Sequence, residues 1–268
     1  MTKMCLGKPR RVVNNMEGPS ASEAASADLH SQLASVDRIR ILSEVQKEEL
    51  HVNEVAKRLS MTATETLRQF QRLSEAGFLE KEPDGKYRLT NYGKLALDMS
   101  SPLDFISRHK DYFKDHDAFF LPTEFRARLG ELSKCEFVPT TVETINKVTR
   151  MFSGAEKHVD TVIVGTESII EILRPRLVDG VKIRWLMHEG FKARAPAVLR
   201  AWKQLPEIRW TPSVPGHIVV TDRAALLTLR GTDGTMTYQC FYGEDASSLR
   251  WVNDLFTYEF ERAKPWYP

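Results

Sequence analysis

Residues 51–90, HVNEVAKRLSMTATETLRQFQRLSEAGFLEKEPDGKYRLT, constrain the fold more than any other part of the chain. Their first half predicts two short amphipathic helices joined by a tight turn. In the first helix, apolar residues recur at the spacing of one helix face, at Val52, Val55, Ala56 and Leu59. Thr62 and Glu65 have the spacing of a capping box that begins the second helix. The apolar positions of that helix are Leu67, Phe70 and Leu73.

A charged β-hairpin follows the second helix. Gly77 lies where the C-cap of a helix needs a residue that tolerates positive φ. Phe78 and Leu79 then begin a strand, and the Pro83-Asp84-Gly85 segment provides a turn before residues 87–90 return. Two helices followed by such a hairpin predict an α+β winged helix-turn-helix domain over residues 29–100.

The polar residues of this segment suit a DNA groove. Arg and Gln make paired hydrogen bonds to guanine and adenine edges in the major groove, and Thr hydroxyls at a helix N-terminus favour phosphate contact. Cations on the hairpin can contact the backbone or the minor groove. The candidate DNA-binding residues are therefore Thr62, Thr64, Glu65, Arg68, Gln69, Arg72, Lys86 and Arg88. The alternative is that these residues form the solvated polar face of a small helical domain.

The segment RLSEAGFLEK and the DGKYRLTNYG that follows it resemble the winged-helix transcription regulators of the ArsR, MarR and TrmB type. The resemblance covers residues 33–93. It implies a transcription regulator that binds double-stranded DNA, and a regulator that reads paired half-sites requires a two-fold partner, so we expect a homodimer.

The net charge of the chain does not by itself indicate a nucleic-acid-binding protein. Between residues 29 and 100 each basic residue is matched by an acidic one, and the whole chain carries a formal net charge of +2. DNA affinity is therefore expected to depend on base and shape readout, with fewer phosphate contacts than a strongly basic protein makes.

Length and composition bound the remaining classes. At 268 residues the prior favours two domains. Because no apolar run approaches a membrane span and the N-terminus lacks a secretory signal, we expect a soluble cytoplasmic protein without membrane partners. Cys5, Cys135 and Cys240 are far apart in the sequence, so we expect reduced thiols and no metal or cofactor. Redox sensing by Cys135 or Cys240 is the alternative.

The N-terminal residues differ in composition from the rest. Residues 1–28 are first basic and turn-rich, then small and polar, with little to bury, which predicts a disordered arm. Its cations could follow DNA phosphates near the winged domain: Lys3, Lys8, Arg10 and Arg11. An inert leader is the alternative.

Residues 101–120 are expected to link the two domains. A helix that begins after Thr90 should end before Pro102, and a second helix should then carry a heptad-like seam of Leu103, Ile106, Lys110 and Phe113. Such a helix suits dimerisation. The alternative is that its apolar stripe packs on the next domain.

Residues 121–268 alternate apolar strands with helices, which predicts an α/β effector domain with a mixed sheet. The later strands are expected to be antiparallel. Strands are expected at residues 159–166, 181–188, 208–212, 217–222, 225–231 and 237–243, and helices at residues 143–155, 167–180, 195–204 and 247–263.

Polar residues near the ends of three of these strands are the candidates for effector binding. Ligands of open α/β sheets bind outside the carboxyl ends of the strands. Thr166 and Glu167 follow the first strand, His188 ends the second, and His217 lies beside a third with Asp222. The alternatives are a helix N-cap for Thr166 and Glu167 and a loop contact for His188. The sequence does not distinguish a small-molecule from a protein effector.

The C-terminal half resembles the archaeal TrmB-like regulators and the family of a methanogenesis regulatory protein. The segments LPTEFRARLGEL, IVVTDRAALLTL and WVNDLFTYEFERA carry the likeness, within residues 117–263. That family has a domain related to phospholipase D, whose catalysis uses a His, a Lys two residues on and a later Asp. Here His217 is present, but Val219 stands in place of the Lys and Asp222 comes too early.

A phosphoryl-transfer site without its cation lacks the main stabiliser of its transition state, so we expect a sensing domain and no enzyme. Two alternatives remain at this stage. One is a phospholipase D-like phosphodiesterase or nuclease with a DNA-binding module. The other is a winged helix that contacts proteins within a transcription assembly.

Overall fold

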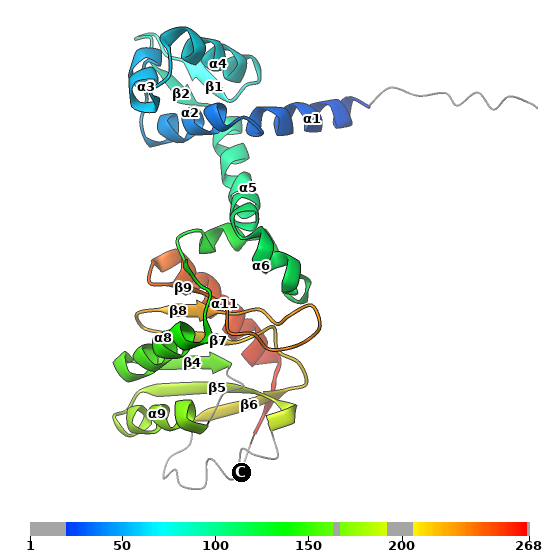
Figure 1. Ribbon diagram of the computed structural model, residues 1–268, viewed down its shortest axis with the longest axis vertical. Coiled ribbons are helices and arrows are strands. Elements are labelled where there is room, and N and C mark those ends of the chain that lie inside the picture. Colours follow the sequence, from blue (N-terminus) through cyan, green and yellow to red (C-terminus); the bar gives the residue numbers. More distant parts are fainter. Residues whose placement is uncertain (1–19, 163–166, 192–205, 267–268) are drawn as a thin grey trace, which may run out of the picture. The chain divides into compact units, whose positions relative to one another are not determined.

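The computed structural model describes residues 20–162, 167–191 and 206–266. The chain forms two compact units, which divide between Asp98 and Met99 (Figure 1). The first unit contains four helices, a two-stranded hairpin and the beginning of helix α5. The second unit contains the remainder of α5 and a mixed sheet with helices on both faces. Among the described residues, every helix is too short or too polar to cross a membrane.

The first unit has the predicted winged helix-turn-helix order of elements. Its helices are α1 (Ala21–Leu33), α2 (Val36–Lys47), α3 (Val52–Leu59) and α4 (Ala63–Glu75), and its hairpin consists of β1 (Leu79–Lys81) and β2 (Tyr87–Leu89). The strands are antiparallel, with Glu80 opposite Arg88. The turn glycines have the positive φ that their positions predict, +78° at Gly77 and +89° at Gly85. The fold expected from residues 51–90 is confirmed.

Buried aromatic and aliphatic side chains hold this unit together. Phe70 of α4 packs edge-on against Tyr87 of β2 with ring centroids 4.8 Å apart. The other fully buried side chains of the cluster come from α2, α3, α4 and the hairpin: Ile41, Leu42, Val55, Leu73 and Phe78. The hairpin is therefore fixed to α4 through shared core residues.

Part of the segment expected to be a disordered arm is helical. Residues 21–28 belong to α1, which Ser20 caps in a reciprocal bond with Glu23, so disorder up to residue 28 is wrong. The small polar residues allow a helix because Ser20 provides its cap and Glu23 the acidic residue of its first turn. Residues 1–19, with the cations expected to track phosphates, lie outside the described part of the chain.

The expected break before Pro102 is also wrong. Helix α5 runs from Asn91 to Arg108 with Pro102 inside it, and α6 follows at Lys110–Asp115. Pro102 removes one backbone hydrogen bond, but the carbonyl that loses its partner belongs to Asp98, an exposed residue that water can reach. Ile106 and Phe113 of the predicted seam pack against the core of the second unit, as the alternative held.

The second unit contains an eight-stranded mixed sheet in the order β10-β6-β5-β4-β7-β8-β9-β3. The pairs β4–β5 and β5–β6 are parallel, and all other pairs are antiparallel. The strands are β3 (Glu136–Val138), β4 (His158–Val162), β5 (Lys182–His188), β6 (Glu207–Thr211), β7 (Ile218–Thr221), β8 (Ala225–Leu227), β9 (Cys240–Gly243) and β10 (Lys264–Pro265). The predicted mixed α/β fold is confirmed, although the sequence missed the two edge strands, β3 and β10.

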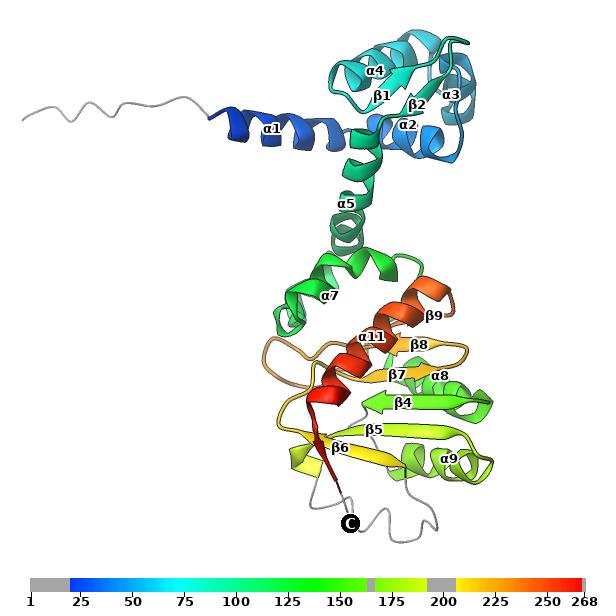
Figure 2. The same cartoon turned by 180° about the vertical axis from the view of Figure 1, so that it is seen from behind.

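Helices cover both faces of this sheet. They are α8 (Thr141–Gly154), α9 (Glu167–Val178) and α11 (Ala246–Arg262). Helix α7 (Thr123–Ala127) packs against the 3₁₀ turns at Ala118–Phe120 and Leu129–Leu132, and a further 3₁₀ turn lies at Glu189–Phe191. Figure 2 shows α11 crossing the face opposite to α8 and α9. The helix predicted at residues 195–204 lies outside the described residues.

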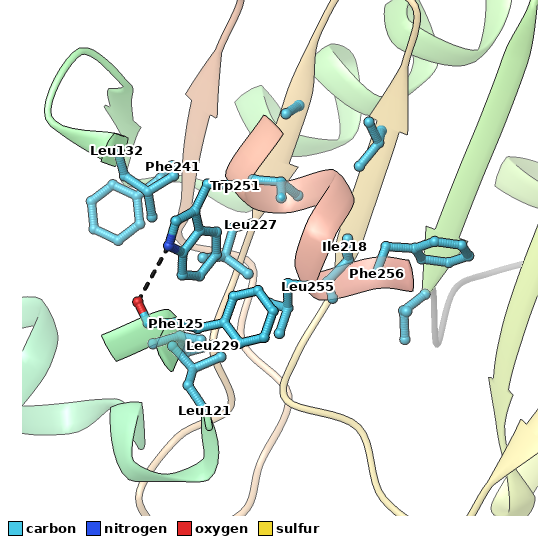
Figure 3. Close-up of a cluster of buried hydrophobic side chains, with 14 of the residues drawn as sticks. Leu121, Phe125, Leu132, Ile218, Leu227, Leu229, Phe241, Trp251, Leu255 and Phe256 are labelled. Carbon is cyan, nitrogen blue, oxygen red and sulfur yellow. Dashed lines mark hydrogen bonds between the residues drawn. The ribbon is translucent and has the colours of Figure 1, made fainter. Parts of the chain in front are cut away.

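Trp251 of α11 lies at the centre of the core on the α11 face. It is fully buried, its indole N–H donates to the carbonyl of Phe125 at 3.3 Å, and aliphatic and aromatic side chains surround it (Figure 3). The opposite face has its own core around Trp185 and Phe152. The sheet is therefore packed between two separate cores, and these cores fix the strand ends at which the candidate sites lie.

Candidate functional site

The first turns of α4 expose most of the predicted DNA-binding residues. The Thr62 hydroxyl caps the helix by accepting from the backbone N–H of Glu65 at 3.2 Å, which confirms the predicted helix start. The Glu65 carboxylate does not return to Thr62, so the capping box is only half formed. Thr62, Thr64 and Arg72 are exposed, and the side chain of Arg68 is 58% exposed. These side chains can reach a groove that receives the N-terminus of α4.

Gln69 is not on the exposed face, contrary to the prediction. It is 5% exposed, and its amide donates to Glu65 Oε1 at 2.5 Å and accepts from Arg38 at 3.4 Å. The predicted apolar position Leu67 is 43% exposed instead. The buried positions of α4 are Thr66, Gln69, Phe70 and Leu73, so the helix is rotated relative to the prediction.

A chain of hydrogen bonds links α1 to the exposed face of α4. The buried Arg38 of α2 donates to the carbonyls of Ser31 at 2.5 Å and Gln32 at 3.0 Å, near the C-terminus of α1. Arg38 then contacts Gln69, Gln69 binds Glu65, and Glu65 accepts from Arg68 at 2.7 Å. Hydrogen bonds from Arg68, and then from Gln69, hold the pKa of Glu65 below its usual value.

Sequence reasoning missed Arg38, although a signal was present. The buried residues of α2 are Arg38, Ile41, Leu42 and Val45, which follow one helix face. A lone arginine on an otherwise apolar face marks a buried cation that needs acceptors. Here the acceptors are backbone carbonyls of α1 and the amide of Gln69, so Arg38 fixes both neighbours.

The cations of the hairpin are mostly neutralised by its own carboxylates. Arg88 contacts Glu82 and pairs with Glu80 at 2.9 Å, and Lys86 lies 3.7 Å from Asp84. Lys81 is exposed and forms no ion pair with the described residues, although its ammonium lies 5.9 Å from the Tyr87 ring. Lys81, one of the hairpin cations expected to contact DNA, is therefore the hairpin cation most available to a phosphate.

Of the four predicted effector-binding residues, the structure describes the side chains of His188 and His217. Thr166 lies outside the described residues, and Glu167 begins α9 but its side chain lies outside them as well. His188 ends β5, and its Nδ1 accepts from the backbone N–H of Gly190 at 3.0 Å. His188 thus satisfies a loop, which is the alternative given for it.

His217 is sealed inside the second unit. It is 5% exposed directly before β7, and its ring stacks on Tyr238 with centroids 5.2 Å apart. Burial lowers the pKa of His217 to about 4, against the opposing effect of a backbone hydrogen bond at Val162. Val219, in the position of the missing Lys, is fully buried. The imidazole is therefore neutral at pH 7 and shielded from any bulky substrate.

Asp222 has a structural role. Its Oδ1 accepts from the backbone N–H groups of Glu156 at 3.0 Å and Lys157 at 3.1 Å, and so fixes the loop before β4. Among the described residues, no group of His, Cys, Asp or Glu side chains is arranged to hold a metal ion.

A cavity of about 770 Å³ opens at the opposite edge of the sheet from the predicted positions. Its lining includes the first residues of three strands, His158 of β4, Lys182 of β5 and Glu207 of β6. Arg184, the buried Asp160, Lys157 and Asn253 also line it. The carboxyl-end rule does not predict this cavity, which lies at the amino ends of the three strands.

No protein-family model matches the chain, and no curated protein matches it either. Two solved structures are similar in outline. TrmBL2, described as an archaeal chromatin protein with a novel mode of DNA binding, has 16% identity and a TM-score of 0.40 over 91% of this chain and 99% of its own. NucT from Helicobacter pylori has 12% identity and a TM-score of 0.39 over 50% of this chain and 98% of its own. At these values we draw no functional inference from either structure.

Proposed function

We propose that this protein is a sequence-specific DNA-binding transcription regulator whose second unit senses an effector. The observation that carries the proposal is the outward display of Thr62, Thr64, Arg68 and Arg72 at the start of α4, on a helix whose opposite face is fixed in the core. A helix presented in this way suits the major groove, where Arg pairs with guanine. Lys81 of the hairpin adds a contact to the DNA backbone.

Internal ion pairs shape the expected mode of binding. Arg68 pairs with Glu65, Arg88 pairs with Glu80, and Arg58 pairs with Glu48 at 2.8 Å. Cations already paired release fewer counterions on binding DNA, so the salt dependence of affinity should be shallow. The preference for the operator over random DNA should then be greater than that of a protein that binds through a basic surface.

We propose that the regulator is a homodimer that pairs through α5. Tyr92, Leu95, Met99 and Leu103 of this helix are all exposed and recur at spacings of three and four residues. Such a stripe suits pairing with the same stripe of a second copy, because both would lose their contact with water. The stripe shares Leu103 with the predicted seam, whose Ile106 and Phe113 pack against the core of the second unit.

We further propose that the second unit catalyses no phosphoryl transfer. The support is the burial of His217 and Val219, which leaves neither an accessible nucleophile nor a neighbouring cation. Turnover of a phosphodiester substrate that disappears in His217→Ala would contradict this part of the proposal.

Selection of bound fragments from genomic DNA by the purified protein, at two salt concentrations, tests DNA reading. A palindromic sequence should be recovered at both concentrations. Arg68→Ala should weaken binding to that sequence much more than to random DNA, by about 1–3 kcal/mol. Arg174→Ala, which changes an exposed arginine of the second unit, is the control. Recovery of random fragments alone would reject sequence-specific reading.

A further inference from the structure

Arg184 is a constrained cation of the second unit. Its guanidinium forms two hydrogen bonds with Asp160, from Nε to Oδ1 at 2.7 Å and from Nη2 to Oδ2 at 2.6 Å. Asp160 is 2% exposed, and it lies opposite Arg184 on the neighbouring strand. One edge of the guanidinium is therefore fixed by a buried carboxylate.

Aromatic rings hold Arg184 from the side of α11. The guanidinium carbon lies 5.1 Å from the centroid of Phe256 and 5.4 Å from that of Phe260. Contacts of this kind limit the rotation of the side chain at small entropic cost. Arg184 keeps about a third of its side chain exposed and forms no hydrogen bond from Nη1 to the described residues. Its outer edge thus remains available on the cavity side.

The lining of the cavity contains further polar groups besides Arg184 and Asp160. Lys157 and Lys182 contribute exposed ammonium groups, His158 an imidazole and Asn253 an amide that can donate or accept. Glu207 also lines the cavity, and both Glu207 and Glu261 lie close enough to Arg184 to act on it electrostatically. In the lining, Lys157, Lys182 and Arg184 are matched against Asp160 and Glu207, which leaves one net positive charge with His158 not counted. Glu261 is not part of the lining.

We propose that this cavity binds a small molecule that carries a phosphate or carboxylate group. The free edge of Arg184 would bind two oxygens of the anion, since a guanidinium fork matches both groups. Lys182 and Lys157 would neutralise the remaining charge, and Asn253 would hold a neutral oxygen of the same molecule. The proposal that the anion binds rests on the cavity alone. The proposal that the bound anion is the effector rests on the function proposed above.

Titration calorimetry of the full chain with inorganic pyrophosphate, and separately with citrate, tests the binding and distinguishes the two classes of anion. Saturable binding of one probe is expected, and Lys182→Ala should weaken it about fivefold to tenfold. Lys182 is exposed, so this variant retains the fold. Lys110→Ala, at an exposed position of α6, is the matched control and should leave the affinity unchanged.

Arg184→Met with Asp160→Asn removes the fixed guanidinium without leaving a buried unpaired charge, and it should abolish binding. Absence of binding by both probes at millimolar concentration would overturn the proposed site. So would equal affinities of the native protein, Lys182→Ala and the double variant. The calorimetry contains no DNA, so failure of the proposed DNA binding leaves its result unaffected.

The effector role has a separate test in the DNA affinity of the native chain with and without the bound probe. The affinity should change about 5- to 150-fold, and DNA should change the affinity of the probe by the same factor. An anion that binds without any change in DNA affinity would overturn the effector role.

Discussion

Two regions of the molecule carry polar residues at the beginning of a regular element, and the structure treats them in opposite ways. At the start of α4, Thr62, Thr64 and Arg68 face solvent around a helix anchored by Phe70. Directly before β7, His217 is enclosed next to Tyr238, with Val219 fully buried two residues later. The residue types alone do not separate an interface from an interior. The difference is that α4 has one packed face, whereas β7 is a central strand with both faces covered.

Introducing the absent lysine tests the enclosed region most severely. Val219→Lys places a charge in a fully buried position of β7, within a cluster of apolar side chains. We expect the second unit to lose on the order of 4 kcal/mol in its free energy of unfolding, and no phosphodiesterase activity to appear. Every tryptophan of the sequence follows Met99, so tryptophan fluorescence in urea reports this unit specifically.

Val219→Met, of similar volume to the lysine but uncharged, is the control, and it should cost much less. A stable, active Val219→Lys protein would reverse the comparison, since β7 would then present an open site.

The pH dependence of stability tests the enclosure of His217 itself. Its pKa falls from 6.5 to about 4 on folding, so the unfolded chain binds the extra proton between those values. The contribution of the neutral, buried His217 to the free energy of unfolding is complete above pH 6.5, and it is lost as the pH falls from 6.5 to 4. The native protein should therefore lose about 3 kcal/mol more than His217→Gln between pH 7 and pH 4, measured by urea unfolding. Parallel pH profiles for the two proteins would place His217 in contact with water.

These two regions also show how far the sequence could lead. The winged helix was predictable because its helices are amphipathic and Gly77 and Gly85 fall where turns need positive φ. The alternating strands and helices of the second unit were predictable for the same kind of reason. Strand β10 is two residues long and β3 lies at the far edge of the sheet, so neither leaves a clear apolar pattern.

The candidate sites were harder to predict because they depend on contacts between distant residues. Gln69 is polar, and only its contacts with Arg38 and Glu65 make burial favourable. The cavity at Arg184 depends on Asp160 of a neighbouring strand and on Phe256 of α11, and no local spacing brings these together. Hydrophobic periodicity finds faces of elements, but it does not find paired polar groups across them.

The exposed face at the start of α4 depends on the buried Gln69, whose amide donates a hydrogen bond to Glu65. Gln69→Ala should destabilise the first unit by about 1–2 kcal/mol, since Arg38 loses one acceptor and Glu65 one donor. It should also reduce discrimination between operator and random DNA by freeing Glu65 and Arg68. Amide hydrogen exchange in α4 and DNA titrations measure the two effects. Gln71→Ala, at an exposed position of the same helix, should change neither.

The smallest expected effects separate two cations of the hairpin. Arg88 is held by Glu80 and Glu82, so Arg88→Ala should change DNA affinity by less than about 0.5 kcal/mol and leave its salt dependence unchanged. Lys81 is exposed and unpaired with described residues, so Lys81→Ala should weaken operator and random DNA equally and reduce the salt slope by about one. Fluorescence anisotropy at several salt concentrations measures both. If Arg88→Ala has the larger effect, its ion pairs open on DNA, and pairing within the hairpin does not decide which of its cations meet phosphate.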